Sequence, residues 1–506
     1  MTEEYAENGG LCKITHQVLL LTPEKYAEEC IEATISVFKE AHLDLTRDTR
    51  MHWQSLMVSL PMTMGPLLAK DLEVAQRQST KTITNAANFS PFLAEFQGTG
   101  PRNGEESLTP LLLLTGQHGQ ITPVDPFASS GNYNAIIVGT SGAGKSALTN
   151  DLITGNLGTG GKTYVIDVGA SYKKLCQLLK GQWIEYGHDT HLVINPFELV
   201  RDIKEDMGFL LPILVEMASP NEGLSDFAQS VLQAHAIFCL KKAKENNTVA
   251  TVTDLVNSLS RGLVNPEKSS TPDRRVTDLA VQLSPFARDG AYGRHFDGRS
   301  TVNFNNDFIV LELEGLKGRK TLQSVVLLCL IFLITQDLTT GDKHTRKMVV
   351  IDEAWDLLSH KHAGNFIQNG YRRARKQNAP FITITQSFAD YHQNDPARAA
   401  LDNADIRFAL RHKAESLRFM ESPNHVALSH RQMTVKNNIS VPDVDYSACH
   451  VLTPDPLPAL FDNRFDPFSR LLYSSRATDV ARVETLMQKG LSVTEAISTI
   501  LESERT

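Results

Sequence analysis

One eight-residue stretch constrains the fold of this chain more than any other. It reads Gly139-Thr140-Ser141-Gly142-Ala143-Gly144-Lys145-Ser146 and matches the pattern G-x-x-x-x-G-K-[ST] in full. The apolar run Ala135–Val138 leads into it, and Ala147–Ile153 continues from it as a helical stretch. Glycines let such a loop wrap with its backbone N–H groups pointing inward, and the N-terminus of the following helix favours an anion. The pattern therefore predicts a phosphate-binding loop between a buried strand and a helix.

The residue types of this loop suit a nucleoside triphosphate with Mg²⁺. Lys145 is expected to reach the β- and γ-phosphates, and Ser146 to hold the metal ion. The alternative is a glycine-rich turn that holds no ligand. We expect contacts with the nucleotide from Gly139, Thr140, Ser141, Gly142, Ala143, Gly144, Lys145, Ser146 and Ala147.

A second motif, much later in the chain, places two acids after a buried strand. The apolar run Met348–Ile351 ends in Asp352 and Glu353. Open parallel sheets place their ligands at the carboxyl ends of the strands. We therefore expect Asp352 to bind Mg²⁺ and Glu353 to act as the general base that polarises the attacking water. The alternative is that both acids only stabilise a helix N-terminus.

Further polar residues follow neighbouring strand candidates. Gln386 closes the apolar run Phe381–Thr385 and is expected to sense the γ-phosphate or to orient water, although a polar residue can simply end a strand. Asp167 ends the run Tyr164–Ile166, where a place near the magnesium ion and a role in a turn fit equally. Glu312 and Glu314 flank Leu313 and are weaker candidates.

A basic segment, Arg372-Arg373-Ala374-Arg375-Lys376, lies between these two strands. Cations near the C-terminus of a helix stabilise it, which explains the segment without any ligand. The functional hypothesis is that Arg375 acts as an arginine finger across a subunit interface.

The order of the apolar runs indicates the fold class. Five short apolar runs rich in β-branched residues alternate with helical stretches, which favours an α/β fold with a mostly parallel sheet covered on both faces. They are Ala135–Val138, Tyr164–Ile166, Phe308–Leu313, Met348–Ile351 and Phe381–Thr385. We divide the chain into a partial N-terminal α+β domain (1–100), a linker and lead-in (101–131), an α/β domain (132–476) with an all-helical insertion at about 200–300, and C-terminal helices (477–506).

Composition narrows the function classes. The net charge of -8 argues against a surface built for bulk nucleic-acid binding. Six widely spaced cysteines, without a Cys-x-x-Cys pair, favour a reducing compartment over a disulfide framework or a zinc site. Met1–Gly10 lacks the apolar core of a signal peptide, and the apolar run Val325–Ile334 is shorter than the roughly 20 residues of a bilayer span. We therefore expect a cytoplasmic protein in which Val325–Ile334 is a buried helix.

Several motifs in one order resemble the TraC-type conjugative transfer ATPases of type IV secretion systems, within the HerA/FtsK branch of RecA-like motors. Besides the loop and the Arg-Lys helix, the resemblance rests on Asn132-Tyr133-Asn134, Val165-Ile166-Asp167-Val168-Gly169-Ala170-Ser171-Tyr172, Ile194-Asn195-Pro196-Phe197, Ile351-Asp352-Glu353-Ala354-Trp355, Thr385-Gln386-Ser387, Asp466-Pro467-Phe468-Ser469-Arg470-Leu471-Leu472-Tyr473-Ser474 and the closing segment Gly490 to Ala496. It covers residues 110–500 well and 11–100 more loosely. Relatives usually have a longer N-terminal half, so the resemblance implies a truncated N-terminal domain here.

The resemblance implies an oligomeric motor of the hexameric kind, with ATP and Mg²⁺ as ligands. In that family ATP turnover drives pilus assembly and substrate export at the inner-membrane channel. The resemblance therefore also implies a cytoplasmic assembly peripheral to the inner membrane, with inner-membrane secretion components as partners. Matching residues of the family's nucleotide site are Lys145, Ser146, Asp352, Glu353 and Gln386.

Two other functions are alternatives. A DNA-translocating motor, of the coupling-protein or chromosome-translocase type, is disfavoured as the main function by the acidic balance. A nucleotide-binding scaffold without turnover needs neither Glu353 nor Gln386. ATP rather than GTP rests on the resemblance, together with the absence from the sequence of a guanine-reading Asn-Lys-x-Asp motif.

Overall fold

The computed structural model divides the chain into two compact units, Met1–Ala94 and Glu95–Thr506. It describes residues 10–505 except 41–42, 50, 61–64, 89–95, 97, 100–108, 117–118, 130, 188–191, 221, 269–270, 343, 355–370, 372–375, 413–445 and 453–458. Each unit is described by itself below.

The first unit is small and has little interior. Strands β1 and β2 pair antiparallel, and of the described residues in this unit only Leu72 and Thr82 are buried. Its elements are β1 (Leu11–Ile14), η1 (Glu24–Tyr26), α2 (Ala27–Glu40), α3 (His52–Ser59), α4 (Pro66–Val74), β2 (Ser79–Thr82) and α5 (Ile83–Asn88).

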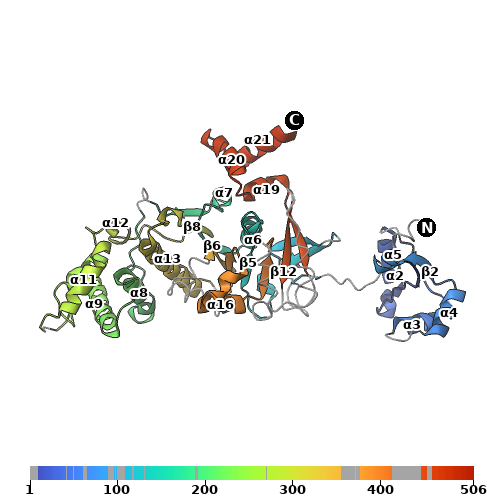
Figure 1. The fold of residues 1–506 in the computed structure, drawn as a ribbon, viewed down its shortest axis with the longest axis horizontal. Coiled ribbons are helices and arrows are strands. Elements are labelled where there is room, and N and C mark those ends of the chain that lie inside the picture. The colour runs from blue at the N-terminus through green and yellow to red at the C-terminus, as the bar shows by residue number, and fades with distance from the viewer. Residues whose placement is uncertain are drawn as a thin grey trace. The chain divides into compact units, whose positions relative to one another are not determined.

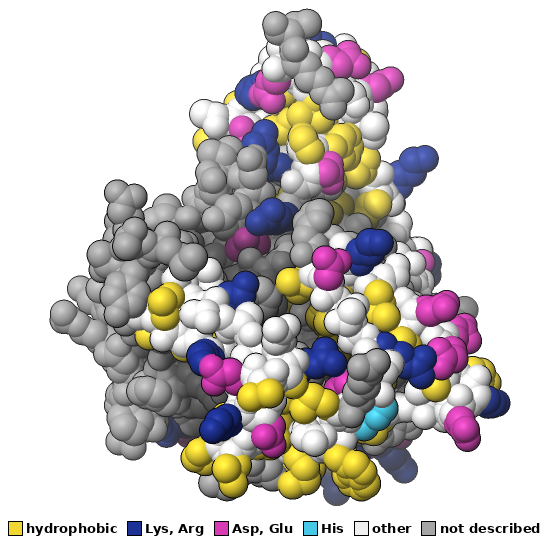
Figure 2. All heavy atoms as spheres, turned by 90° about the vertical axis from the view of Figure 1, so that its right-hand side faces the viewer, with side chains coloured by type: hydrophobic (Ala, Val, Ile, Leu, Met, Phe, Trp, Pro, Cys, Tyr) yellow, Lys and Arg dark blue, Asp and Glu magenta, His cyan; other side chains and the backbone are white. Residues whose placement is uncertain are grey.

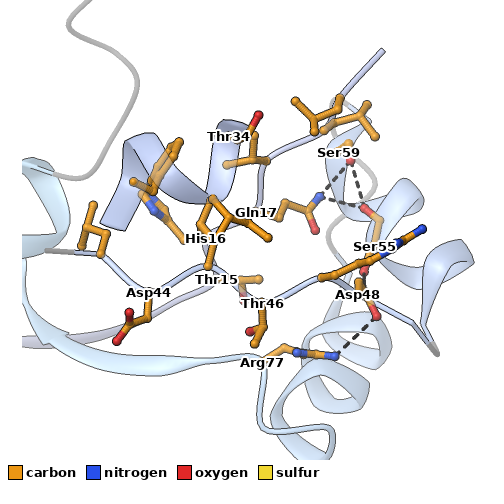
Figure 3. A pocket seen from close by; sticks show the side chains of 18 of the residues that line it. Thr15, His16, Gln17, Thr34, Asp44, Thr46, Asp48, Ser55, Ser59 and Arg77 are labelled. Carbon is orange, nitrogen blue, oxygen red and sulfur yellow. Dashed lines mark hydrogen bonds and ion pairs between the residues drawn. The ribbon is translucent and has the colours of Figure 1, made fainter. Parts of the chain in front are cut away.

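A cavity of about 750 Å³ lies between these elements (Figure 3). Polar side chains that line it bind one another. The Gln17 amide donates to the Ser55 carbonyl and to the Ser59 hydroxyl, and Arg77 lies 3.4 Å from Asp48. The Gln17 contacts connect the chain after β1 with α3, and the Arg77–Asp48 pair connects the chain after α4 with the chain before α3, so we interpret them as structural.

The second unit is built on one large sheet (Figure 1). Eleven described strands follow the order β4-β3-β13-β12-β11-β5-β10-β9-β6-β8-β7. They are β3 (Leu112–Gly116), β4 (Ile121–Val124), β5 (Ala135–Val138), β6 (Lys162–Asp167), β7 (Gln182–Glu185), β8 (Phe308–Glu312), β9 (Lys347–Ile351), β10 (Phe381–Thr385), β11 (Ile406–Ala409), β12 (Tyr446–Leu452) and β13 (Leu460–Arg464). Neighbours from β11 to β7 are parallel, and those from β11 to β4 are antiparallel. The expected α/β fold with a mostly parallel sheet is confirmed. Some of the stretch 101–131, assigned to a linker from the sequence, supplies β3 and β4.

Both faces of the sheet are covered, which explains why the central strands are continuous apolar runs. Along β5, Ile136 and Val138 join one hydrophobic cluster, whereas Ala135 and Ile137 join the other. On the second face lie α6 (Lys145–Gly158), α7 (Lys173–Leu178), α19 (Pro467–Tyr473), α20 (Ala477–Gln488) and α21 (Val493–Arg505). On the first face lie α13 (Lys320–Thr340) and α16 (Asp395–Asp402).

The chain between β7 and β8 carries a set of helices within residues 203–296. Figure 1 shows these helices at one end of the unit and the antiparallel strands at the other. They are α8 (Ile203–Ala218), α9 (Asp226–Glu245), α10 (Val252–Leu259), α11 (Arg274–Leu283) and α12 (Gly293–Phe296). The short 3-10 turns of the unit are η2 (Pro126–Ala128), η3 (Ser284–Phe286), η4 (Glu314–Leu316) and η5 (Phe388–His392).

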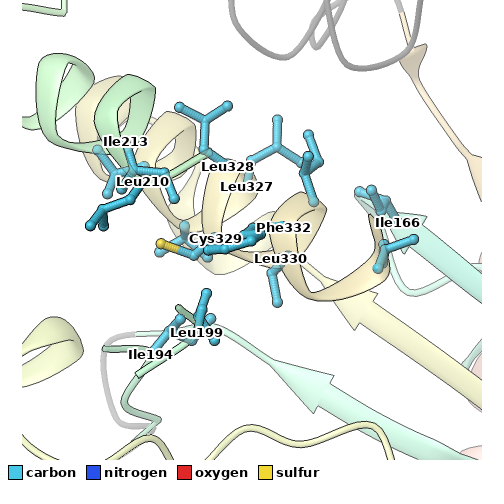
Figure 4. Packing of buried hydrophobic residues seen from close by; sticks show 14 of the residues in the cluster. Ile166, Ile194, Leu199, Leu210, Ile213, Leu327, Leu328, Cys329, Leu330 and Phe332 are labelled. Atoms are coloured by element: carbon cyan, nitrogen blue, oxygen red, sulfur yellow. The ribbon is translucent and has the colours of Figure 1, made fainter. Parts of the chain in front are cut away.

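Helix α13 joins the sheet to this helical segment. Its Leu327 and Phe332 belong to the cluster that contains Ile166 of β6 and Leu210 of α8 (Figure 4). Among the described helices α13 is the one long and apolar enough to cross a membrane, but 83% of its most apolar window is buried inside the protein. The expected buried helix at Val325–Ile334 is therefore confirmed.

Candidate functional site

Three neighbouring parallel strands end side by side at one edge of the sheet. β10 pairs with β5 on one side and with β9 on the other. The residues that follow these strands are Gly139 after β5, Asp352 after β9 and Gln386 after β10. Because the carboxyl ends of parallel strands meet at the same edge, motifs distant in sequence converge there.

The loop after β5 requires glycine at two places. Gly142 has a φ of +72° and Gly144 a φ of +94°, in the left-handed region that side chains disfavour. Gly144 is also the N-cap of α6, so the chain turns there from loop into helix. The loop thus presents the N-terminal end of α6 toward the sheet edge, an arrangement that favours an anion.

Backbone hydrogen bonds fasten this loop to both neighbouring strands. The Gly139 amide donates to the Thr385 carbonyl of β10 over 3.3 Å. The amide and the hydroxyl of Thr140 both donate to the carbonyl of Arg411, which follows β11, over 3.0 and 3.2 Å. The loop is therefore held in place by the sheet itself.

The Lys145 ammonium lies within this loop. Its Nζ donates to the Gly139 carbonyl at 2.9 Å and to the Thr140 carbonyl at 3.5 Å. Burial lowers the pKa of Lys145, while the nearby carboxylates of Glu353, Asp352 and Asp390 oppose that effect. The lysine and the later acidic pair therefore lie near one another, while their roles in one site remain predictions.

Asp352 is buried, with 6% of its surface exposed, and both of its oxygens are held. Oδ2 accepts a hydrogen bond from the Tyr172 hydroxyl at 2.8 Å, and Oδ1 accepts one from the Glu353 amide at 2.8 Å. Burial raises the pKa of Asp352, and these two hydrogen bonds counteract it by stabilising the charged form.

Glu353 and Gln386 contact each other. Nε2 of Gln386 lies 3.2 Å from Oε1 and 3.4 Å from Oε2 of Glu353. The backbone of Glu353 has a φ of +48°, which is rare for a residue with a side chain. An unusual backbone at a polar site is a pointer to function, because the surrounding structure must hold it there.

Asp390 is a site residue that the sequence analysis missed. It lies in η5, where its side chain accepts from the Ser387 amide at 3.0 Å in a capping box. Burial raises the pKa of Asp390, and the nearby Glu353 carboxylate adds to that, whereas Lys145 opposes it. The spacing Ser387-x-x-Asp390 signals a cap, and only the fold shows that this cap lies beside Lys145.

Two further buried acids, Asp167 and Glu312, lie near Asp352. Burial raises the pKa of Asp167 well above its ordinary value, and the carboxylates of Glu312 and Asp352 raise it further. The backbone amides of Val168 and Tyr172 lie near the Asp167 carboxylate and partly counteract the rise in its pKa. In the described structure, however, neither oxygen of Asp167 accepts a hydrogen bond of normal geometry.

The remaining predicted residues divide into two groups. Ser141, Ala143, Ser146 and Ala147 lie in the loop and the first turn of α6. Arg375 lies outside the described residues, so its predicted role as an arginine finger is not placed.

The residue types present fit a magnesium–nucleotide. A carboxylate from Asp352 and a hydroxyl from Ser146 are oxygen ligands of the kind Mg²⁺ takes, with phosphates and water completing its shell. No group of three His, Cys, Asp or Glu side chains among the described residues is arranged to hold a metal ion alone. The glycine loop and Lys145 fit the phosphates.

Comparisons with known proteins identify relatives of this chain. Protein TraC of Escherichia coli (strain K12) is 29% identical over 494 residues, which cover 93% of this chain and 53% of TraC. A probable conjugal transfer protein TrbE of Sinorhizobium fredii is 24% identical over 274 residues, covering 52% of this chain and 40% of that protein. The chain thus spans about half the length, or less, of these curated relatives.

The solved structure of VirB4 of Thermoanaerobacter pseudethanolicus matches the fold, with a TM-score of 0.58 at 21% identity. That match covers 73% of this chain and 99% of the VirB4 chain. The model of the family described as TraG P-loop domain matches residues 123–504. With the similarity to TraC, it confirms the resemblance found in the sequence: the chain belongs to the TraG P-loop domain family.

Proposed function

We propose that this protein hydrolyses ATP at the site formed by the loop after β5 and by Asp352, Glu353 and Gln386. One observation carries the proposal: neighbouring parallel strands bring the Lys145 ammonium beside the carboxylates of Asp352 and Glu353. A triphosphate site needs this pairing of a phosphate-binding cation with a metal ligand and a general base.

Each side chain has a role that follows from its position. The loop amides and Lys145 bind the phosphates and stabilise the charge that develops on them. Ser146 and Asp352 would hold Mg²⁺, which, when bound, neutralises charge on the β- and γ-phosphate oxygens. Glu353 takes the proton of the attacking water, and Gln386, which contacts the Glu353 carboxylate, orients this base.

We further propose that turnover occurs in an oligomer, to which Arg375 contributes an arginine finger. Such a finger, supplied across a subunit interface, raises the rate roughly 10³- to 10⁵-fold in enzymes of this type. The family resemblance supports a hexamer, and ATP as the nucleotide.

The similarity to TraC and TrbE supports a role in conjugative type IV secretion. In this role the protein would work in the cytoplasm, at the inner membrane, and its ATP turnover would power pilus assembly and substrate export with inner-membrane secretion components. The one described helix with the length and apolarity of a membrane span lies in the protein core.

A DNA-translocating motor is the alternative. Among the described side chains on the face shown in Figure 2, Lys and Arg lie interspersed with Asp and Glu. The net charge of -8 favours a protein substrate over DNA. Stimulation of the ATPase rate by DNA at physiological salt would support the alternative.

The site is tested with two variants. Lys145→Ala should abolish both nucleotide binding and hydrolysis. Glu353→Gln should reduce kcat by about 10²-fold or more while nucleotide binding persists, because only the base is lost. The matched control is Glu245→Gln at the end of α9, which makes the same change on an exposed side chain. Normal turnover in either site variant would refute the assignment.

A further inference from the structure

Tyr172 is a buried side chain that the motifs leave without a role. It is the N-cap residue of α7, and 0% of its surface is exposed. Its hydroxyl donates to Oδ2 of Asp352 over 2.8 Å, although the two residues are 180 positions apart in the chain. Since the Glu353 amide binds Oδ1, the tyrosine supplies the second contact that fixes the plane of this carboxylate.

The hydroxyl also lies near the helix that follows the phosphate loop. The side chain of Thr149, one turn after Lys145 in α6, lies near the hydroxyl oxygen of Tyr172. Thr149 is itself fixed, because its hydroxyl donates to the Lys145 carbonyl at 2.9 Å. Tyr172 therefore binds the Asp352 carboxylate that follows β9 and lies beside α6, the helix that begins with Lys145 and Ser146.

The loop that precedes Tyr172 is fixed by hydrogen bonds to Glu312. Glu312, at the end of β8, accepts from the Ala170 amide at 2.6 Å and from the Gly169 amide at 3.3 Å. Ala170 has a φ of +56°, so the turn it makes is one that needs such support. A carboxylate that fastens two consecutive amides fixes where the following tyrosine enters the site.

We propose that Tyr172 is a positioning residue for the magnesium site: its hydroxyl fixes the orientation of the Asp352 carboxylate and so sets how tightly Mg²⁺ binds together with nucleotide. The proposal rests on the proposed function, because it takes Asp352 as a metal ligand. Groups that orient a metal ligand commonly change metal affinity about 10- to 100-fold when removed.

The test is Tyr172→Phe, which removes one hydroxyl and keeps the ring. Equilibrium binding of a fluorescent, non-hydrolysable ATP analogue is titrated with Mg²⁺, and repeated in EDTA. We expect the variant to need about tenfold more Mg²⁺ for half-maximal gain in affinity. Its affinity in EDTA should equal that of the unchanged protein, since the phosphate loop is untouched.

Tyr164→Phe is the matched control. Tyr164 lies on β6, is equally buried, and its hydroxyl donates to the carboxylate of Asp337 on α13, away from the loop. The control loses the same kind of hydrogen bond, so it should lose stability without a shift in the Mg²⁺ midpoint.

The outcomes separate the two proposals. If the unchanged protein shows no Mg²⁺-dependent gain in affinity, the proposed function fails. If the unchanged protein shows the gain, two results overturn the role of Tyr172. In one, Tyr172→Phe has the same Mg²⁺ midpoint as the unchanged protein; in the other, Tyr172→Phe loses as much affinity in EDTA as it loses with Mg²⁺. Should Tyr172→Phe not fold, Glu312→Gln decides, because a weakened hold on the loop should shift the midpoint in the same direction, and an unchanged midpoint counts against the proposal.

Discussion

Glu353, the proposed general base, has an unfavourable backbone conformation. Its φ of +48° occurs just beyond the end of β9, and its amide donates to Asp352 at 2.8 Å. For a residue with a Cβ, this left-handed conformation costs roughly 1–2 kcal/mol. The residue with this strained backbone is also the one whose carboxylate contacts Gln386. Strained backbone conformations are often found at functional sites.

This strain predicts a difference between two inactive variants. Glu353→Gly should have a free energy of unfolding about 1 kcal/mol higher than Glu353→Ala, because glycine adopts a positive φ without steric cost. Urea denaturation of both variants, with ATP hydrolysis measured in parallel, checks this. Equal stabilities, or a more stable alanine variant, would show that the backbone at this position is not strained.

The same site shows what local patterns can and cannot predict. Lys145, Asp352, Glu353 and Gln386 each follow a strand in a recognisable motif, and the structure brings all four together, while their catalytic roles remain predictions. Tyr172 ends the motif Val165–Tyr172, but nothing in that motif indicates a contact with Asp352. Its role depends on a contact with a residue 180 positions away, and only the fold reveals that contact.

Among the elements, the fully buried parallel strands were the predictable ones. The sequence bounds of β5 and β10 agree with the structure, and β6, β8 and β9 differ by one or two residues. A strand covered on both faces is apolar at every position, so its pattern is plain. The strands β11, β12 and β13 were missed because they interleave polar residues such as Arg407 and Asp462 with apolar ones over few positions.

The C-terminal helices were predictable for a different reason, since their ends carry local signals. Gly490, with a φ of +95°, follows α20. Ser492 and Glu495 form a capping box at the start of α21, with Oε2 of Glu495 accepting from the Ser492 amide at 2.8 Å. How these helices attach to the sheet was not predictable.

Lys174 binds the first of these C-terminal helices, α19, to α7. Nζ of Lys174, on α7, donates to the carbonyls of Leu471 and Ser474 at the end of α19, over 2.5 and 2.7 Å. Burial lowers the pKa of Lys174 to about 8, although Asp479 and Glu484 oppose that effect. The ammonium therefore remains mostly charged near neutral pH, where it satisfies two carbonyl groups.

Lys174→Met should loosen the C-terminal helices. The apolar stem is kept, but two hydrogen bonds from a charged donor are lost, each worth about 1.5–3 kcal/mol. We expect amide hydrogen exchange in α19–α21 to accelerate by roughly 30-fold or more, as a loss of about 2 kcal/mol implies. Lys173→Met, on the adjacent residue, should leave the exchange nearly unchanged. Equal protection in the two variants would contradict the anchoring role.

For the whole molecule, the proposed arginine finger makes turnover a property of the assembly. The specific activity should rise with protein concentration, because a finger from one subunit completes the site of another. The clearest test mixes two variants, Glu353→Gln and Arg375→Ala, each expected to be nearly inactive alone. In a mixed oligomer an intact base meets an intact arginine at some interfaces, so activity should return. Arg375→Ala as active as the unchanged protein, or a mixture of two inactive variants that regains no activity, would remove Arg375 from the mechanism.

The helical segment within residues 203–296 is inserted between two strands at one margin of the sheet, and this position has a consequence for how such a protein can diversify. The chain leaves through β7 and returns through β8, and these two strands pair in parallel, with Gln182 opposite Ile309. Both lie at the margin of the sheet farthest from β11, with β9 and β6 between them and β10. Helices can therefore vary in sequence and length there while the pairing of the strands that carry the candidate site stays the same. That margin is where evolution, or an engineer, can vary the surface of the protein at a distance from its candidate site.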